Sequence, residues 1–324
     1  MGHSSWIIES SVVGGIRANV ETIWLVDWSD RLYGHSHPQS KKVAEGKMSH
    51  WSGGLAEWTE GDTAFVSVAF SWRANDAFMR CSWLNAEGYK VRVGGPGIFD
   101  KRIRSQFDGV AEIGGEVDAI VRHNSDATFA SRGCPMNCSF CIVPKMEGTK
   151  FMLIPDFTPR PILCDNNVSA LPEDYQDHII ERYKKFNVRL EDINSGFEPH
   201  TFDESIYAKW RAFYKGAWRF AFDEMREEKQ VKNMFRILGN EPAGKKRVYV
   251  LIGNEPFEQC FERVMKVIEW GGEPHVQPMI PLGAMTKMPV IQFDWSLQKL
   301  KDLARWANRW IWRSVKFEDY KGQQ

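Results

Sequence analysis

The placement of the cysteines constrains this chain more than any other feature of its sequence. Three of its six cysteines lie within the stretch SRGCPMNCSFC at residues 131–141, and the other three are scattered. An apolar core gains nothing from three thiols this close together. A disulfide, a metal ion or an iron–sulfur cluster would use them. We therefore expect one site to be formed by Cys134, Cys138 and Cys141.

The number of ligands separates these alternatives. A structural zinc site takes four protein ligands, commonly as two separated pairs, and this chain has one C-x3-C-x2-C group. His123 and Cys164 are further ligand types, but neither lies at zinc-finger spacing. A disulfide would leave one thiol unpaired in a chain without a disulfide framework. A cubane cluster can take three thiolates and keep its fourth iron open, so the pattern favours a cluster over zinc.

Composition narrows the class of protein. The chain has 324 residues, 43% of them hydrophobic, with 42 basic and 42 acidic side chains. Such a chain can form one large or two ordinary domains, and its balanced charge argues against a whole-molecule polyanion binder. We find no apolar run of about 20 residues, as a membrane span requires. The opening residues lack the features of a secretory signal, so we expect a cytoplasmic protein.

Hydrophobic patterning predicts an α/β fold. Apolar runs at 21–28, 62–72 and 89–97 read as strands, and the segment before Gly88 reads as a helix. Alternating strands and helices indicate a parallel sheet, and the GGPG turn after the last of these strands is placed where such sheets bind ligands. We therefore predict a Rossmann-like parallel-sheet domain over residues 1–122.

The pattern restarts after residue 123. Six further strands, each followed by a helical stretch, are expected at 127–131, 160–167, 188–196, 218–224, 247–255 and 275–282. They predict a partial (β/α)6 barrel of the TIM type over residues 123–295, with the cysteines on a loop after its first strand. A helical tail is expected over 296–324. Its arginines and tryptophans at helical spacing are Arg305, Arg309, Arg313, Trp306 and Trp310.

The stretch SRGCPMNCSFCIVPKMEG resembles the cluster loop of the radical S-adenosylmethionine superfamily, whose signature is C-x3-C-x-φ-C with Phe140 at the aromatic position φ. The resemblance implies a [4Fe–4S] cluster held by the three cysteines, with S-adenosylmethionine chelated at the open iron. It also implies reductive cleavage to a 5′-deoxyadenosyl radical that abstracts hydrogen from an unidentified substrate. A reducing partner such as flavodoxin or ferredoxin would supply the electron.

The same resemblance suggests further site residues at the strand ends. ILCDNN matches the place where the family contacts the methionine amino group, although the common GGE is absent; later segments match contacts to the ribose or carboxylate and to the adenine. Besides Phe140, the residues so implied are Asp165, Asn166, Asn167, Asn194, Ser195, Arg219, Gly253 and Asn254. Asp223 and Glu224 are candidates for catalytic acid or base.

The N-terminal domain resembles, more weakly, the cobalamin-binding domain of one branch of the superfamily. The D-x-H-x-x-G motif of that branch is absent, and GHSHP at 34–38 does not reproduce it. One alternative function is therefore a cobalamin-dependent radical methyltransferase. Another is a non-enzymatic module that carries zinc or a cluster and binds nucleic acid through its Trp/Arg tail.

Overall fold

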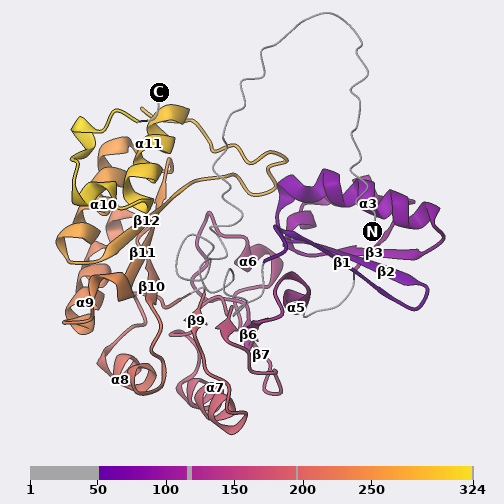
Figure 1. Cartoon of the computed structure of the whole chain (residues 1–324), viewed down its shortest axis with the longest axis horizontal. Helices are drawn as coiled ribbons and strands as arrows, with labels where there is room; N and C mark the ends of the chain where they lie inside the picture. The colour runs from indigo at the N-terminus through magenta and orange to yellow at the C-terminus, as the bar shows by residue number, and fades with distance from the viewer. Residues whose placement is uncertain (1–50, 115–118, 195, 323–324) are drawn as a thin grey trace, which may run out of the picture.

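The computed structural model describes residues 51–114, 119–194 and 196–322 (Figure 1). It is a mixed α/β structure with parallel sheets, and the described strands form no closed barrel. A four-stranded sheet lies on one side of the molecule and two three-stranded parallel sheets on the other. The expected strand at 21–28, the GHSHP segment and Ser195 lie outside the described residues.

The N-terminal sheet is mixed, whereas the sequence predicted a purely parallel one. Its strands, in spatial order, are β1 (Leu55–Glu60), β2 (Thr63–Val68), β3 (Lys90–Gly94) and β4 (Glu112–Ile113). β2, β3 and β4 are parallel as expected, but β1 pairs antiparallel with β2. The physical reason is the tight Gly61–Asp62 turn, where Gly61 adopts a φ of 61° that suits a two-residue hairpin.

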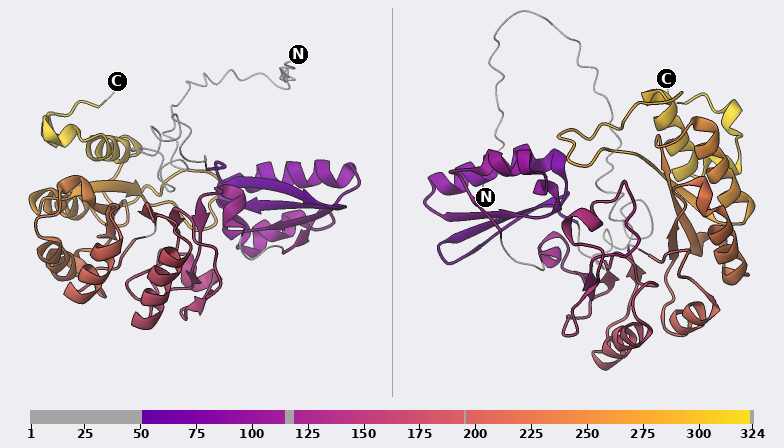
Figure 2. Two further views of the ribbon diagram at one scale, coloured as in Figure 1. Left: turned by 60° about the horizontal axis from the view of Figure 1, so that its bottom comes forward. Right: turned by 180° about the vertical axis from the view of Figure 1, so that it is seen from behind.

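Helices of this region follow the expected pattern. α3 (Ala74–Ala86) covers one face of the sheet (Figure 2) and stops two residues before Gly88, whose φ is 91°. The predicted helix is thus confirmed, and Gly88 provides the left-handed turn that ends it. Two short helices follow, α4 (Lys101–Arg104) and α5 (Ile120–His123).

All six strands expected after residue 123 are present and parallel within their sheets. One sheet contains β5 (Ala127–Thr128), β8 (Ile162–Leu163) and β9 (Asp192–Ile193), and the other contains β10 (Trp218–Ala221), β11 (Lys246–Ile252) and β12 (Glu273–Pro278). The strands follow one another in chain order within each sheet. Among the described residues, β9 and β10 are not paired by backbone hydrogen bonds, so the six strands form two separate sheets.

A helix follows each of these strands. They are α6 (Val143–Met146), α7 (Glu173–Lys185), α8 (Glu204–Phe213), α9 (Glu228–Leu238), α10 (Phe257–Glu269) and α11 (Leu297–Asn308). α7 to α10 lie on the outer side of the strands (Figure 1). In α10, Cys260, Val264 and Val267 share one buried face, as spacing by three and four residues requires. One hydrophobic core runs under both three-stranded sheets.

The C-terminal tail is less helical than the sequence predicted. α11 ends at Asn308, and Trp310 has a left-handed φ of 54°, after which the chain forms short 3-10 turns. Trp306 is 2% exposed and donates its indole N–H to the carbonyl of Val315 at 2.8 Å. Arg313 instead pairs with Glu273 at 2.7 Å. The expected Arg/Trp stripe therefore does not form along one helix.

The loop between β12 and α11, residues 279–295, reaches from the C-terminal sheet to the N-terminal one (Figure 1). The Ser71 hydroxyl donates to the carbonyl of Ala284 at 2.6 Å, and Lys287 lies over the ring of Trp72. Met285 packs against the N-terminal core. These contacts attach the N-terminal sheet to the rest of the chain. No helix in the described ranges is long and apolar enough to cross a membrane.

Candidate active site

The cysteine loop begins and ends at a short antiparallel pair of strands, β6 (Ser131–Arg132) and β7 (Met152–Leu153). Gly133 has a φ of 84°, and a Cβ there would lie 2.2 Å from the carbonyl oxygen of Lys150. Only glycine fits this close crossing of the two ends of the loop. The Cys134 amide donates to the carbonyl of Gly148 at 3.3 Å, which closes the loop at its neck.

Glu147 fixes this neck. One of its carboxylate oxygens pairs with Arg132, and the other accepts the Gly133 amide at 2.9 Å and the Asn166 side-chain amide at 2.7 Å. The residue therefore ties both ends of the loop to the segment that follows β8. Because Asn166 uses its amide here and on the Gly133 carbonyl, it positions the loop from the neighbouring strand end.

The three thiols are partly exposed at the tip of the loop. The Cys141 amide donates to the carbonyl of Cys138 at 3.1 Å, and Asn137 takes a left-handed φ of 51° between the first two cysteines. Burial, followed by the nearby Cys141, Glu198, Cys134 and Asp223, raises the pKa of Cys138 to about 12. Burial also raises the pKa of Cys141, so the thiols of Cys138 and Cys141 by themselves favour the protonated form.

The three cysteines are the donor set on which the expected metal group depends. Within the described ranges, no three His, Cys, Asp or Glu side chains are placed to hold one metal ion. In a cubane each cysteine would bind a different iron. A metal would also supply the positive charge that turns crowded thiols into thiolates. That Cys134, Cys138 and Cys141 hold a cluster stays a prediction.

Asn167 and Asp165, which both follow β8, hold the cysteine loop in position. Asn167 is 4% exposed and directs its amide toward the Cys134 sulfur at 3.7 Å. Asp165 is fully buried and accepts the Ala130 amide at 2.6 Å and the Ser131 hydroxyl at 2.5 Å. Burial raises the pKa of Asp165 to about 6. Both its carboxylate oxygens are occupied, so in this structure it anchors the start of the loop.

Two carboxylates, one in the segment after β9 and one in the segment after β10, lie near the cysteine loop. Glu198 and Asp223 lie close enough to Cys138 to raise its pKa. One oxygen of Asp223 accepts the Leu251 amide at 3.0 Å. Burial, with the charge of Glu227 next, raises the pKa of Asp223 to about 7. A carboxyl with such a pKa can hold or release a proton near neutral pH.

Glu224, the other predicted acid or base, has a local structural role. It caps the 3-10 turn Met225–Glu227, in which the Glu224 side chain accepts from the Glu227 backbone and the Glu227 side chain accepts from the Glu224 backbone. It also pairs with Arg226. Glu227 additionally accepts the Asp223 amide at 2.8 Å, so this cap helps to fix Asp223.

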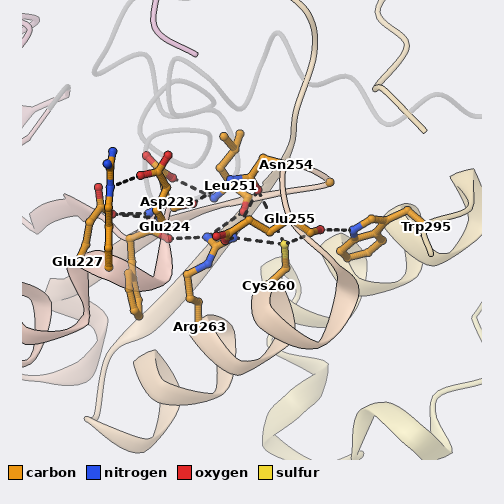
Figure 3. A network of polar contacts seen from close by, with 12 residues as sticks. Asp223, Glu224, Glu227, Leu251, Asn254, Glu255, Cys260, Arg263 and Trp295 are labelled. Carbon is orange, nitrogen blue, oxygen red and sulfur yellow. Dashed lines mark hydrogen bonds and ion pairs between the residues drawn. The ribbon is translucent and has the colours of Figure 1, made fainter. Parts of the chain in front are cut away.

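A fully buried arginine holds the ends of β10 and β11 together (Figure 3). Arg263 donates to the carbonyls of Phe222 at 2.7 Å and Leu251 at 2.9 Å, and to Glu255 at 2.8 Å. Asn254 joins the same network and donates to the Asp223 carbonyl at 2.9 Å. Asn254 thus supports the β10 end, and its predicted contact with adenine stays a prediction.

The remaining predicted residues lie in different surroundings. Arg219 is 5% exposed and bound to Asp192, so it contributes to the interior of the fold. The Gly253 carbonyl accepts from the Gln292 side chain at 2.8 Å, which ties it to the 279–295 loop. Asn194 lines a cavity described below, and Phe140 is partly exposed beside the cysteines. Contact of these residues with S-adenosylmethionine stays a prediction.

Sequence reasoning missed several residues that shape this site. Glu147 follows the cysteines by only six positions, and a lone glutamate in a loop carries no signal for its partners. Arg263 lies on a helix, and an arginine there is ordinarily expected to be exposed to solvent. Glu198 follows directly on the INSGF segment at the end of β9, so its place at a strand end was the available signal.

A cavity of about 480 Å³ separates the N-terminal sheet from the segments next to the cysteine loop. Its walls include Gly95 and Pro96 of the GGPG turn on one side, and Val143 and Asn166 on the other. The turn therefore lines a cavity at the carboxyl end of its strand, where open α/β sheets bind ligands.

No family model matches this chain, and no curated protein matches it either.

Proposed function

We propose that this protein is a radical S-adenosylmethionine enzyme. The observation that carries the proposal is the cysteine loop: three thiols on one loop closed at its neck, with Asn167 beside the first and the carboxylates of Glu198 and Asp223 near the second. A cluster at these thiols would supply the electron that cleaves S-adenosylmethionine to a 5′-deoxyadenosyl radical, which takes hydrogen from the substrate.

The chain's own residues divide the remaining tasks. Glu147 and Asp165 hold the loop in position, and Asn167 places an N–H donor next to the Cys134 sulfur. Asp223 is the candidate to hold or accept a proton from a bound ligand, because its second oxygen has no bonding partner among the described residues. We propose that Glu198 and Asp223 together form a polar surface near the thiols.

We also propose the finer description of the fold. Six parallel strands in chain order, each followed by a helix, support a partial (β/α)6 barrel of the TIM type that is open between β9 and β10. The parallel strands β2 to β4, with α3 on one face, support a Rossmann-like domain extended by the antiparallel β1.

The deciding experiment is anaerobic reconstitution with iron and sulfide, followed by S-adenosylmethionine and dithionite. We expect 5′-deoxyadenosine from the wild type and none from Cys138→Ala. Cys81→Ala is the matched control, because this thiol is buried in the N-terminal core far along the chain from the loop. A protein that contains zinc and no iron and forms no 5′-deoxyadenosine would contradict the proposal. That result would favour the alternative of a non-enzymatic nucleic-acid-binding module.

Cobalamin in the cavity next to the N-terminal sheet is a second candidate cofactor, because of the position of the cavity. The lining residues do not fit a cobalt ligand: His123 is the histidine among them, and its two ring nitrogens are bonded to the hydroxyls of Ser52 at 2.6 Å and Ser67 at 2.9 Å. We therefore derive no step through cobalamin. Co-elution of cobalamin with the reconstituted chain would test this conclusion.

A further inference from the structure

The cavity has the size and the position of a small-molecule site. At about 480 Å³ it lies within the range of about 300–1,000 Å³ that ligand pockets occupy. Ala69, Gly95 and Gly114 follow β2, β3 and β4 directly and form one wall, so the carboxyl ends of three parallel strands meet there. The opposite wall comes from α6, which continues the cysteine loop.

Most of this lining is apolar or aromatic. Trp58 and Phe65 stack with their ring centres 5.2 Å apart and form part of the lining from β1 and β2. Ile98, Phe129 and Met146 add apolar surface from three other segments. Apolar walls contributed by both halves of the molecule favour a ligand with an apolar body.

The positive charges around the cavity differ in whether they are neutralised. Arg92 is paired with Glu112, and Arg132 with Glu147. Arg104 uses its Nε to bond the Ile98 carbonyl at 2.9 Å, and its two terminal nitrogens have no partner among the described residues. Arg104 is exposed, so the structure leaves one oriented guanidinium at the edge of the cavity.

Part of the cavity lining lies next to the cysteine loop. Ile142 lines the cavity and follows Cys141 directly in the chain. Asn166 also lines it and precedes Asn167, whose amide points at the Cys134 sulfur. A ligand that contacts both Arg104 and Asn166 would thus lie next to the residues that hold the thiols.

We propose that this cavity binds the substrate, and that the substrate is an organic acid whose apolar body lies between the two halves and whose anionic group pairs with Arg104. This assignment rests on the proposed function, since that function defines which bound molecule is the substrate. The anionic group can be a carboxylate or a phosphate, because a guanidinium binds both.

The test uses the full reconstituted chain and anilinonaphthalene sulfonate, a fluorescent probe with an apolar body and one anionic group. We expect Arg104→Gln to weaken binding of this probe about tenfold or more, as loss of a charged hydrogen bond does. Phenylnaphthylamine has a similar apolar body without the charge. Its binding affinity should change less than about twofold in Arg104→Gln, because it forms no charged hydrogen bond with Arg104. Arg102→Gln is the matched control, because Arg102 lies on the same short helix but is 87% exposed and pairs with Asp100.

A second pair of variants shows whether the probe occupies the cavity. Ala69→Phe adds a ring inside the lining and should abolish binding, whereas Ala86→Phe adds the same ring at an exposed position of α3 and should leave binding unchanged. Equal effects of Arg104→Gln and Arg102→Gln, or undiminished binding to Ala69→Phe, would overturn the proposal. Displacement of the probe by cobalamin would also overturn the assignment of an organic acid.

Competition distinguishes the two kinds of anion. Naphthoate and naphthyl phosphate share one apolar body, so the stronger competitor identifies the group that Arg104 prefers, and naphthamide should compete weakly. Failure of the cavity proposal is separable from failure of the proposed function. Cys138→Ala should lose deoxyadenosine formation and keep probe binding. Deoxyadenosine from a wild type that does not bind the probe would contradict the cavity assignment alone.

Discussion

Arg219 on β10 donates one hydrogen bond to each carboxylate oxygen of Asp192 on β9, both at 2.8 Å. The two side chains are 6% and 7% exposed, and a further guanidinium nitrogen bonds the hydroxyl of Tyr249. This buried pair crosses the gap at which the described strands change from one three-stranded sheet to the other. It thus joins β10, which is followed by the candidate proton-holding residue Asp223, to the sheet that contains β8. Asn166 and Asn167, which follow β8, contact the cysteine loop.

Removing one partner of this pair should destabilise the fold strongly. We expect Arg219→Met to lower the free energy of unfolding by about 3–5 kcal/mol, because Asp192 would be left as a buried, uncompensated charge. Urea denaturation at neutral pH measures the change. The double variant Arg219→Met with Asp192→Leu should recover much of the loss. The exposed pair Arg80 and Glu57 is the control, and Arg80→Met should cost less than about 1 kcal/mol. Equal losses for both arginines would contradict this account.

Glu147 should matter for metal retention, although it is not a ligand. Glu147→Gln keeps the size of the side chain but loses the charge that pairs with Arg132, so the neck of the loop should loosen. We expect iron affinity to fall about tenfold or more, in line with other residues that orient ligands. Iron content after dialysis against a chelator measures this. Lys150→Gln, an exposed change on the same loop, should retain iron like the wild type.

Asn167 should tune the reduction potential of a cluster at the three cysteines. Its amide lies 3.7 Å from the Cys134 sulfur, and an N–H donor at a sulfur favours the reduced, more negative cluster. Asn167→Leu should therefore make the potential more negative, which redox titration followed by electron paramagnetic resonance would measure. Ser139→Ala, at an exposed position between the second and third cysteines, should leave the reduction potential unchanged. A shift to a more positive potential would rule out this role.

His123 should make the protein sensitive to acid. Burial lowers the pKa of His123 from 6.5 to about 4, so the unfolded chain takes up a proton at a higher pH than the folded chain. The stability it contributes is present above pH 6.5 and is lost as the pH falls toward 4, by about 3 kcal/mol in total.

Urea denaturation across this pH range, with wild type and His123→Gln compared, tests the effect. The variant cannot take up the proton, so its stability should fall less on acidification. His178→Gln leaves the buried His123 in place and should follow the wild type. A pH dependence that His123→Gln leaves unaltered would assign the acid sensitivity to other groups.

Much of the local structure was predictable from the sequence. The strands at 62–72 and 89–97, the helix before Gly88 and all six later strands are present where their apolar runs lie. The hairpin at Gly61 and the end of α11 at Asn308 were missed, because a short turn and a left-handed Trp310 give weak local signals. The candidate site was predictable mainly in its cysteines, whose spacing is itself the signal.

The sequence alone thus determined the order of strands and helices and placed three thiols on one loop, because both depend on residues close together in the chain. Tertiary structure decided which partners those segments meet. It set Glu147 against Gly133 and Asn166, buried Arg263 between two strand ends, and left Arg104 beside the cavity. Such contacts join residues that are distant in sequence, and burial, charge and hydrogen bonding select them only after the chain has folded.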